Sequence, residues 1–221
     1  MHASIEATLG ALAPTSPQPF SARVRLATRV AHQRLEDTAV MRDLMAPDLT
    51  PANYLSTLLL WERCWQPIEA ELAAGLQRGM PAALMPARRL HFLQRDIAYL
   101  QTQCPQANVA SPSTGANRLA SAVASEHGWY GLAYVVQGSL LGGSLVRTRL
   151  MKSLGLVDHQ GTEFFAGGIA PHALHLHWKS WLAQADQQLQ RPTAIREAVE
   201  AADRTFAHME TVFSSACTTH E

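Results

Sequence analysis

The amino-acid sequence predicts an all-α fold built as a single domain. Prolines, which are tolerated at the start of a helix but disrupt its interior, divide the 221 residues at regular intervals. Between the prolines, apolar residues recur every three to four positions, which is the spacing of one helix face. No segment shows the sustained apolar and polar alternation between hairpin turns that is typical of half-buried strands.

Local signals predict where the helices begin and end. Thr50 and Pro51 suit the cap and first turn of a helix in which Pro67 predicts a kink. Gly155 suits the residue that ends a helix, and the segment 111–115, rich in serine and proline, predicts a loop. The predicted helices cover residues 21–45, 51–75, 86–99, 116–126, 129–154, 172–189 and 193–213, with a short helical piece at 162–166.

One domain, from residue 21 to residue 215, accounts for most of the chain, and no linker divides it. Residues 1–20 are mildly apolar but carry Glu6 and three prolines and no Lys or Arg. This composition predicts a flexible N-terminal leader and not a signal peptide. Residues 216–221 are predicted to be a C-terminal tail.

Charge and composition exclude several classes of function. Lys plus Arg and Asp plus Glu both number 18, so the sequence predicts no basic surface for nucleic acid or an anionic membrane. The apolar runs are far shorter than the roughly 20 residues that cross a bilayer. Three cysteines without CxxC spacing argue against a disulfide framework or a zinc site. A cytoplasmic protein is therefore predicted.

A first candidate site lies on the helix predicted over residues 21–45. Spacings of three, four and seven residues place Arg25, Thr28, His32 and Glu36 on one face, which offers a cation, an imidazole and a carboxylate. A metal-bound histidine commonly gives its second ring nitrogen to a carboxylate, and Glu36 can accept it. The small Thr28 leaves room for a flat ligand. Taken alone, however, this spacing is more often that of a partly exposed histidine with a glutamate partner.

A second candidate site is the glycine-rich segment 134–146, which lies inside a predicted helix. Gly138, Gly142 and Gly143 should each cost the helix about 1 kcal/mol relative to alanine. The missing side chains let a backbone bend or approach a large flat group. Close packing of two helices over these glycines explains the segment equally well. Phosphate binding is less well supported, because the glycines do not lie between a strand and a helix start.

Together the two segments describe two walls of a slot for a planar metallocycle. With them, the sequence resembles the biliverdin-producing heme oxygenase family, and more narrowly its bacterial members that are found with bacteriophytochromes. The resemblance covers residues 21 to 213. It is carried by the run from Arg25 to Glu36, by Tyr134-x-x-x-Gly138-Ser139-x-x-Gly142-Gly143, and by Thr205-Phe206-x-x-Met-Glu210.

The resemblance implies a role for each of these residues. His32 would ligate the iron of heme b, with Glu36 as the carboxylate behind it. Gly138, Gly142 and Gly143 would bring the helix backbone close over the heme and leave a small space for dioxygen. The heme propionates would pair with Arg25, Tyr134 and Lys179.

The sequence departs from the family pattern at one position. Animal-type heme oxygenases carry an aspartate directly after the first of these glycines, where it organises the water that delivers protons, and this sequence has Ser139. A hydroxyl donates and accepts hydrogen bonds but cannot act as a carboxylate. Proton delivery is therefore expected to differ, with Gln137 as a further polar candidate.

The resemblance implies that heme is both cofactor and substrate, and that the protein binds and orients it. The expected reaction with dioxygen yields biliverdin, carbon monoxide and ferrous iron. Electrons would come from an external ferredoxin or flavoprotein reductase, because the sequence contains no flavin or nucleotide motif. The bilin would be supplied to a bacteriophytochrome as its chromophore.

Two other functions are compatible with the sequence. A non-catalytic heme carrier or sensor would have the same pocket, and Ser139 would then mark the loss of turnover. A related helical fold that acts on another small molecule, as in thiaminase-like proteins, would bind no heme. That alternative lacks an evident nucleophilic cysteine.

Overall fold

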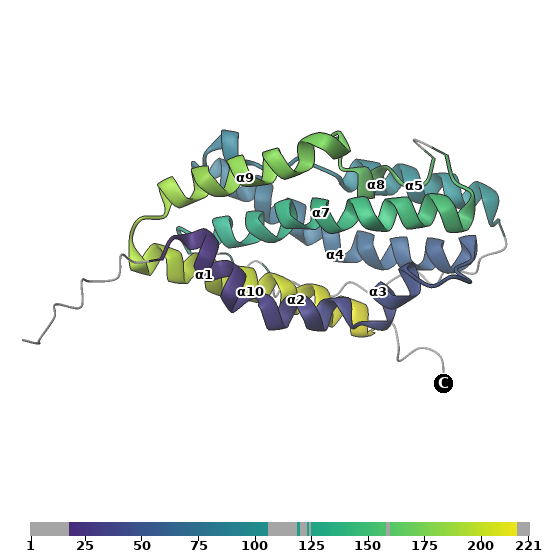
Figure 1. Cartoon of the computed structure of the whole chain (residues 1–221), viewed down its shortest axis with the longest axis horizontal. Helices are drawn as coiled ribbons and strands as arrows, with labels where there is room; N and C mark the ends of the chain where they lie inside the picture. Colours follow the sequence, from purple (N-terminus) through teal and green to yellow (C-terminus); the bar gives the residue numbers. More distant parts are fainter. Residues whose placement is uncertain (1–17, 106–118, 120–122, 124, 158–159, 216–221) are drawn as a thin grey trace, which may run out of the picture.

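A computed structural model describes residues 18–105, 119, 123, 125–157 and 160–215 of the chain. The regular structure of these residues is helical throughout, which confirms the predicted all-α class (Figure 1). Among them, none of the helices is both long and apolar enough to span a membrane. The helices are α1 (Phe20–Ala27), α2 (Arg29–Glu36), α3 (Ala39–Leu44), α4 (Pro51–Gln77), η1 (Ala82–Leu84, a 3₁₀ turn), α5 (Leu90–Gln103), α7 (Gly128–Leu154), α8 (Glu163–Ala166), α9 (Pro171–Gln188) and α10 (Pro192–Ser214).

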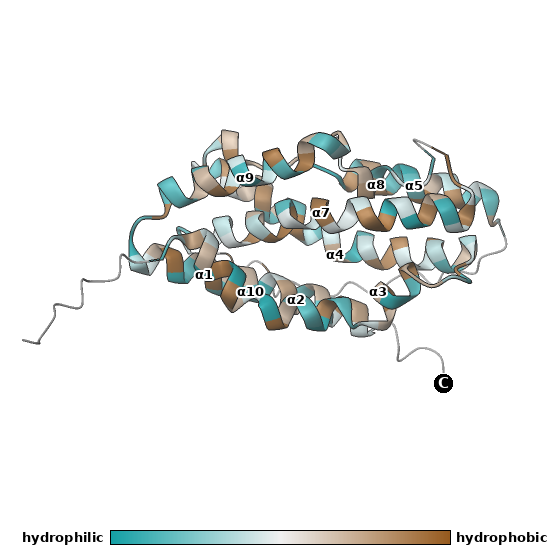
Figure 2. Cartoon of the chain, in the orientation of Figure 1, coloured by the Kyte–Doolittle hydropathy of each residue, from teal (hydrophilic) through white to brown (hydrophobic). Residues whose placement is uncertain are grey.

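Helix α7 runs through the middle of the molecule, with α5, α8 and α9 on one side and α1, α2, α3 and α10 on the other (Figure 1). The most extensive packing is between α7 and α10. Gly131 permits it, because a Cβ at this position would overlap the Ala198 carbonyl oxygen of α10. Hydrophobic and hydrophilic residues alternate along α2 and α10, as they do in amphipathic helices that bury one face (Figure 2).

Helix ends are as predicted where a capping residue marks them. The hydroxyl of Thr50 accepts a hydrogen bond from the Asn53 backbone N–H at 3.2 Å, and Pro51 opens α4. Gly155 follows α7 with a φ of 65°, a left-handed conformation that glycine adopts without steric cost.

The single helix predicted over residues 21–45 is wrong, because this stretch forms α1, α2 and α3. The chain bends at Thr28, whose hydroxyl donates to the Val24 carbonyl at 2.8 Å. It bends again at Asp37 and Thr38, and the Thr38 hydroxyl then caps α3 by accepting from the Met41 backbone N–H. Such local hydrogen bonds compete with a continuous helix, whereas the apolar spacing runs on across the bends.

Other boundaries differ from the prediction in smaller ways. The helix predicted over residues 86–99 is α5, which begins at Leu90 and ends at Gln103. Its start is fixed from another helix, because Glu69 of α4 accepts the backbone N–H groups of Arg89 and Leu90. The loop predicted at 111–115 and most of the helix predicted at 116–126 lie outside the described residues.

The first helix of the described residues starts on a buried aromatic ring. Helix α1 begins at Phe20, and this side chain is fully buried against the ring of Tyr134 at 6.0 Å. Residues 1–17 and the tail 216–221 lie outside the described residues.

Candidate functional site

The structure brings His32 and Glu36 together on α2. Nδ1 of His32 lies 3.6 Å from a Glu36 carboxylate oxygen, and the imidazole side chain is 57% exposed. A carboxylate on the Nδ1 side of an imidazole leaves Nε2 as the available ligand atom. The pair can therefore offer a nitrogen ligand to a group that lies against this face of α2.

The position of His32 depends on α10, which supports α2 from behind. The His32 ring packs edge-on against Phe206 with 5.6 Å between centroids. Arg34 of α2 also donates to the Glu210 carboxylate at 3.2 Å. These two contacts give a structural reason for the motif at residues 205–210, because Phe206 and Glu210 both support α2.

A second group of predicted site residues meets where α1 passes α7. The Tyr134 hydroxyl shares a side-chain hydrogen bond with Thr28, and the charge of Arg25 lies close enough to act on it. Burial raises the pKa of Tyr134, and the contacts with Thr28 and Arg25 oppose that shift. Arg25 itself is exposed, so one end of the site carries an accessible cation and a phenol.

The three glycines of α7 have different surroundings. A Cβ at Gly143 would lie 3.0 Å from the Phe165 carbonyl oxygen, so α8 packs directly on that position. A Cβ at Gly138 would lie 3.5 Å from Trp178, which is an ordinary contact. A Cβ at Gly142 would meet nothing within 4 Å. Helix packing thus accounts for Gly143 but not for Gly142.

Ser139 lies against Arg89, a residue that no sequence motif marks. The guanidinium of Arg89 donates to the Ser139 hydroxyl at 2.6 Å and to the Val136 carbonyl at 3.1 Å. Burial lowers the pKa of Arg89 to about 9, against the opposing charge of Glu69. No local pattern signals this contact, because Arg89 and Ser139 are fifty residues apart in the chain.

Helix α9 also packs against α7, at the side chain of Trp178. Trp178 faces Gly138, and its ring lies 5.3 Å from that of Tyr134. Lys179 follows directly and is exposed. Gln137 is buried, with its side-chain oxygen 3.0 Å from Nε2 of His177, so its amide is held by α9 and not by Ser139.

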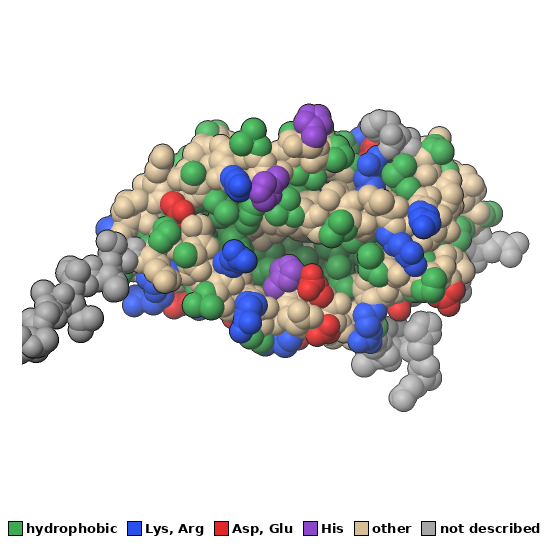
Figure 3. All heavy atoms as spheres, in the orientation of Figure 1, with side chains coloured by type: hydrophobic (Ala, Val, Ile, Leu, Met, Phe, Trp, Pro, Cys, Tyr) green, Lys and Arg blue, Asp and Glu red, His purple; other side chains and the backbone are tan. Residues whose placement is uncertain are grey.

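These elements border a hollow on one face of the molecule. Figure 3 shows the surface hollowed between α1 and α2 on one side and α7 and α9 on the other, with hydrophobic side chains inside. Basic side chains and histidines gather around its rim, and an acidic side chain lies beside a histidine over α2. An apolar interior with cations at the rim suits a flat, largely apolar ligand that carries acidic groups.

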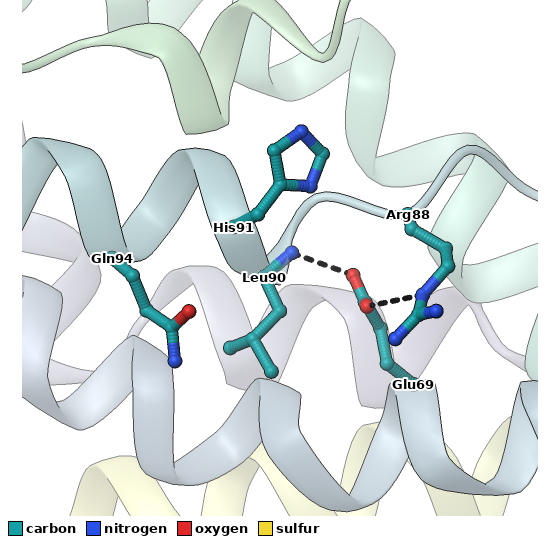
Figure 4. A pocket seen from close by; sticks show the side chains of 5 residues that line it. All are labelled: Glu69, Arg88, Leu90, His91 and Gln94. Carbon is teal, nitrogen blue, oxygen red and sulfur yellow. Dashed lines mark hydrogen bonds and ion pairs between the residues drawn. The ribbon is translucent and has the colours of Figure 1, made fainter.

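A separate depression of about 360 Å³ lies near the start of α5. Figure 4 shows the Glu69 carboxylate bonded to the Leu90 backbone N–H and to Arg88. The remaining lining residues are His91 and Gln94. The carboxylate is already engaged by its neighbours, and none of the predicted site residues lines this depression.

Comparisons with known proteins identify the family and the fold of the chain. The family model described as heme oxygenase matches residues 18–215. The structure of heme oxygenase from Leptospira interrogans superposes with a TM-score of 0.72 at 16% identity, covering 90% of this chain and 100% of that one. Heme oxygenase-1 from the cyanobacterium Synechocystis, in complex with heme, gives 0.70 at 17% identity, with coverages of 90% and 92%.

The NO- and CO-bound heme oxygenase from Neisseria meningitidis gives a TM-score of 0.59 at 19% identity, covering 89% of this chain and 91% of that one. At such identities the structural likeness shows the fold. No curated protein sequence matches this chain significantly.

Proposed function

The chain belongs to the heme oxygenase family of oxidoreductases, and on that premise we propose that it binds heme b between α2 and α7. The bound heme is the substrate, which is oxidised to biliverdin with release of carbon monoxide and ferrous iron. When bound, heme supplies the iron that activates dioxygen and the ring that is opened. The protein supplies binding, orientation and hydrogen bonds.

The observation that carries the proposal is the open space beside Gly142. A glycine in the middle of a 27-residue helix costs about 1 kcal/mol relative to alanine, and no neighbouring side chain or backbone requires it. A bound group whose flat face lies against the helix backbone would require it. Gly138, where a Cβ would make only an ordinary contact, extends the same surface by one helical turn.

On the opposite wall, we assign His32 as the axial ligand of the heme iron. The half-exposed ring supports this role, and so does the Glu36 carboxylate, which lies 3.6 Å from Nδ1 and leaves Nε2 available to ligate. Phe206 limits rotation of the ring from behind.

The propionates would lie at the end of the site where α1 meets α7. Arg25 supplies a charge-assisted hydrogen bond, and Tyr134, ordered by Thr28, supplies a neutral one. Lys179 is the third candidate because it is exposed on α9 beside Trp178. These partners would fix which edge of the ring faces inward.

The oxygen side would be formed by the backbone at Gly138 and Gly142, with Ser139 as the nearest hydroxyl, whereas Gly143 lets α8 pack against the helix. Support for a steric role comes from the lack of side chains at Gly138 and Gly142, where a Cβ would make an ordinary contact with Trp178 or meet nothing within 4 Å. Ser139 exchanges hydrogen bonds with Arg89 and Val136, so its hydroxyl is ordered and can take part in proton delivery.

We further propose a ferredoxin or flavoprotein reductase as the external electron donor, and a bacteriophytochrome as the acceptor of the bilin. The first follows from the lack of a flavin or nucleotide motif in the sequence. The second rests on the resemblance to phytochrome-associated members. Both partners place the protein in the cytoplasm.

Titration with heme, followed by addition of ascorbate or a reductase in air, tests the proposal. We expect stoichiometric uptake of heme and replacement of the Soret band by bilin absorbance, with the pigment identified by chromatography. A heme spectrum that persists unchanged would indicate a carrier, and failure to take up heme would exclude both functions.

Substitution of the proposed axial ligand tests the site itself. We expect His32→Ala to alter the ferric spectrum and to stop turnover until imidazole is added. His172→Ala, which changes an exposed histidine of α9, is the matched control and should behave as wild type. An unaltered ferric spectrum in His32→Ala would remove His32 from the site.

A further inference from the structure

Arg89 is a fully buried cation that precedes α5 and lies against α7. We define the distal segment as residues 136–143 of α7, which contains the three glycines and Ser139. One guanidinium nitrogen of Arg89, Nη2, donates to both the Ser139 hydroxyl and the Val136 carbonyl within this segment. A buried charge is unfavourable unless it is paired and hydrogen-bonded, so the environment of Arg89 must compensate it.

Three neighbours provide that compensation. The guanidinium stacks over the rings of Trp65 and Phe164, with its carbon 4.5 Å and 5.1 Å from their centroids. Glu69 supplies the opposite charge, although its oxygens accept the backbone N–H groups of Arg89 and Leu90 and not the guanidinium. The carboxylate is therefore fixed close to Arg89 without neutralising it by a direct ion pair.

The same contacts fix the hydroxyl of Ser139. This oxygen accepts from Arg89 at 2.6 Å and donates its own proton to the Val136 carbonyl at 2.7 Å. Arg89 thus determines which lone pair of Ser139 is occupied and how the hydroxyl is turned. A cation and an oriented hydroxyl lie together behind the backbone that faces the hollow.

We propose that Arg89 is a positioning residue for the oxygen side of the heme site: it orients Ser139 and places a positive charge behind the distal segment, which favours anionic ligands at the iron over neutral ones. The inference rests on the proposed function, because it requires heme on this face of α7. It also accounts for Ser139, since a cation and a hydroxyl form the polar network here.

The first test uses the heme-free chain. Urea unfolding of Arg89→Met, Ser139→Ala and the double variant forms a cycle that measures the coupling of the two side chains. We expect the double variant to unfold at a urea concentration clearly above that given by adding the two single losses. Strict additivity would contradict the network.

The second test uses ferric heme-loaded protein and compares azide, an anion, with imidazole, which is neutral. We expect Arg89→Met to weaken azide binding about tenfold, the effect of a unit charge acting inside a protein, and to change imidazole binding less than about twofold. Arg88→Met is the matched control. Arg88 is next to Arg89 in the chain, but its guanidinium is largely exposed and pairs with Glu69. The Arg88→Met variant should retain wild-type affinity for both ligands.

If Arg89 had a purely structural role, Arg89→Met would weaken the binding of azide and of imidazole equally. That result would overturn the inference. If Arg89→Met does not fold, Arg89→Lys decides the question. It keeps the charge but loses the planar donor group, so azide preference should persist while the coupling to Ser139 falls. If the wild-type chain takes up no heme, the proposed function is wrong. If Arg89→Met takes up heme and still prefers azide as the wild type does, only the inference about Arg89 is wrong.

Discussion

At the scale of single residues, two adjacent glycines of α7 have opposite requirements. Gly143 is buried against the Phe165 carbonyl, so a side chain there must push α8 away. Gly142 faces open space, so the chain alone gives no reason for the missing side chain. Sequence patterns cannot separate these two cases, because both residues lie in the same apolar run of a helix.

This difference predicts opposite effects of one substitution on the heme-free protein. Gly142→Ala should raise the free energy of unfolding by about 0.5 to 1 kcal/mol, because alanine loses less backbone entropy in a helix. Gly143→Ala should lower it by roughly 1 to 3 kcal/mol through overpacking against α8. Urea unfolding followed by circular dichroism measures both, and changes of the same sign would contradict the assignment.

The residues of the candidate site were predictable to different degrees. His32 and Glu36 follow from helical spacing, because both residues lie on α2. Arg89 was not predictable, because its contacts depend on how α4, α5 and α7 pack. Only the resemblance singled out Ser139.

At the scale of elements, the four-residue helix α8 is held by a carboxylate from α5. Asp96 accepts the backbone N–H groups of Glu163 at 3.0 Å and Phe164 at 2.8 Å. Burial raises the pKa of Asp96 to about 6, although these two hydrogen bonds and the nearby Arg95 oppose the shift. Because α8 lies behind Gly143, this carboxylate also supports the glycine-bearing wall of the hollow.

The raised pKa of Asp96 predicts a pH-dependent stability. The folded chain binds this proton more tightly than the unfolded chain, so the stabilisation is complete below about pH 4 and is lost as the pH rises through about 6. Relative to Asp96→Asn, the wild-type free energy of unfolding should fall by roughly 3 kcal/mol across that range. Urea unfolding at several pH values measures the difference.

Asp43→Asn, at an exposed position of α3, is the control for the loss of one carboxylate and should show no such trend. A constant difference between wild type and Asp96→Asn from pH 4 to pH 7 would mean that the carboxylate titrates normally in the folded chain.

Element boundaries were predictable where a residue next to the helix sets them, as Thr50, Pro51 and Gly155 do. They were not predictable where another element sets them. The start of α5 depends on Glu69 of α4, which is twenty residues earlier in the sequence. The bends around α2 were missed because the apolar periodicity continues through them.

At the scale of the whole molecule, the two walls of the hollow belong to parts of the chain that are far apart in sequence. Helix α2 is held by α10, and α10 in turn packs along α7. A group bound between α2 and α7 would link the N-terminal part of the chain to its central helix. Binding to the folded chain alone raises stability by mass action.

We therefore predict that heme raises the melting temperature of the wild-type chain. At a free heme concentration one hundred times the dissociation constant, the gain should be about 2.7 kcal/mol. Gly142→Leu should melt close to the wild-type temperature without heme and should gain little from it, because the leucine side chain fills the space beside α7. Differential scanning calorimetry with and without heme measures both effects, and equal gains in the two proteins would place the heme elsewhere.

The open position at Gly142 also bears on how such a gene can decay. Most inactivating mutations in a small enzyme unfold it, and proteases then remove the product. A bulky replacement of Gly142 would instead leave a well-folded, abundant chain that no longer binds heme. A natural relative with a large residue at this site in an otherwise unchanged helix is thus expected to be a folded protein without turnover of heme.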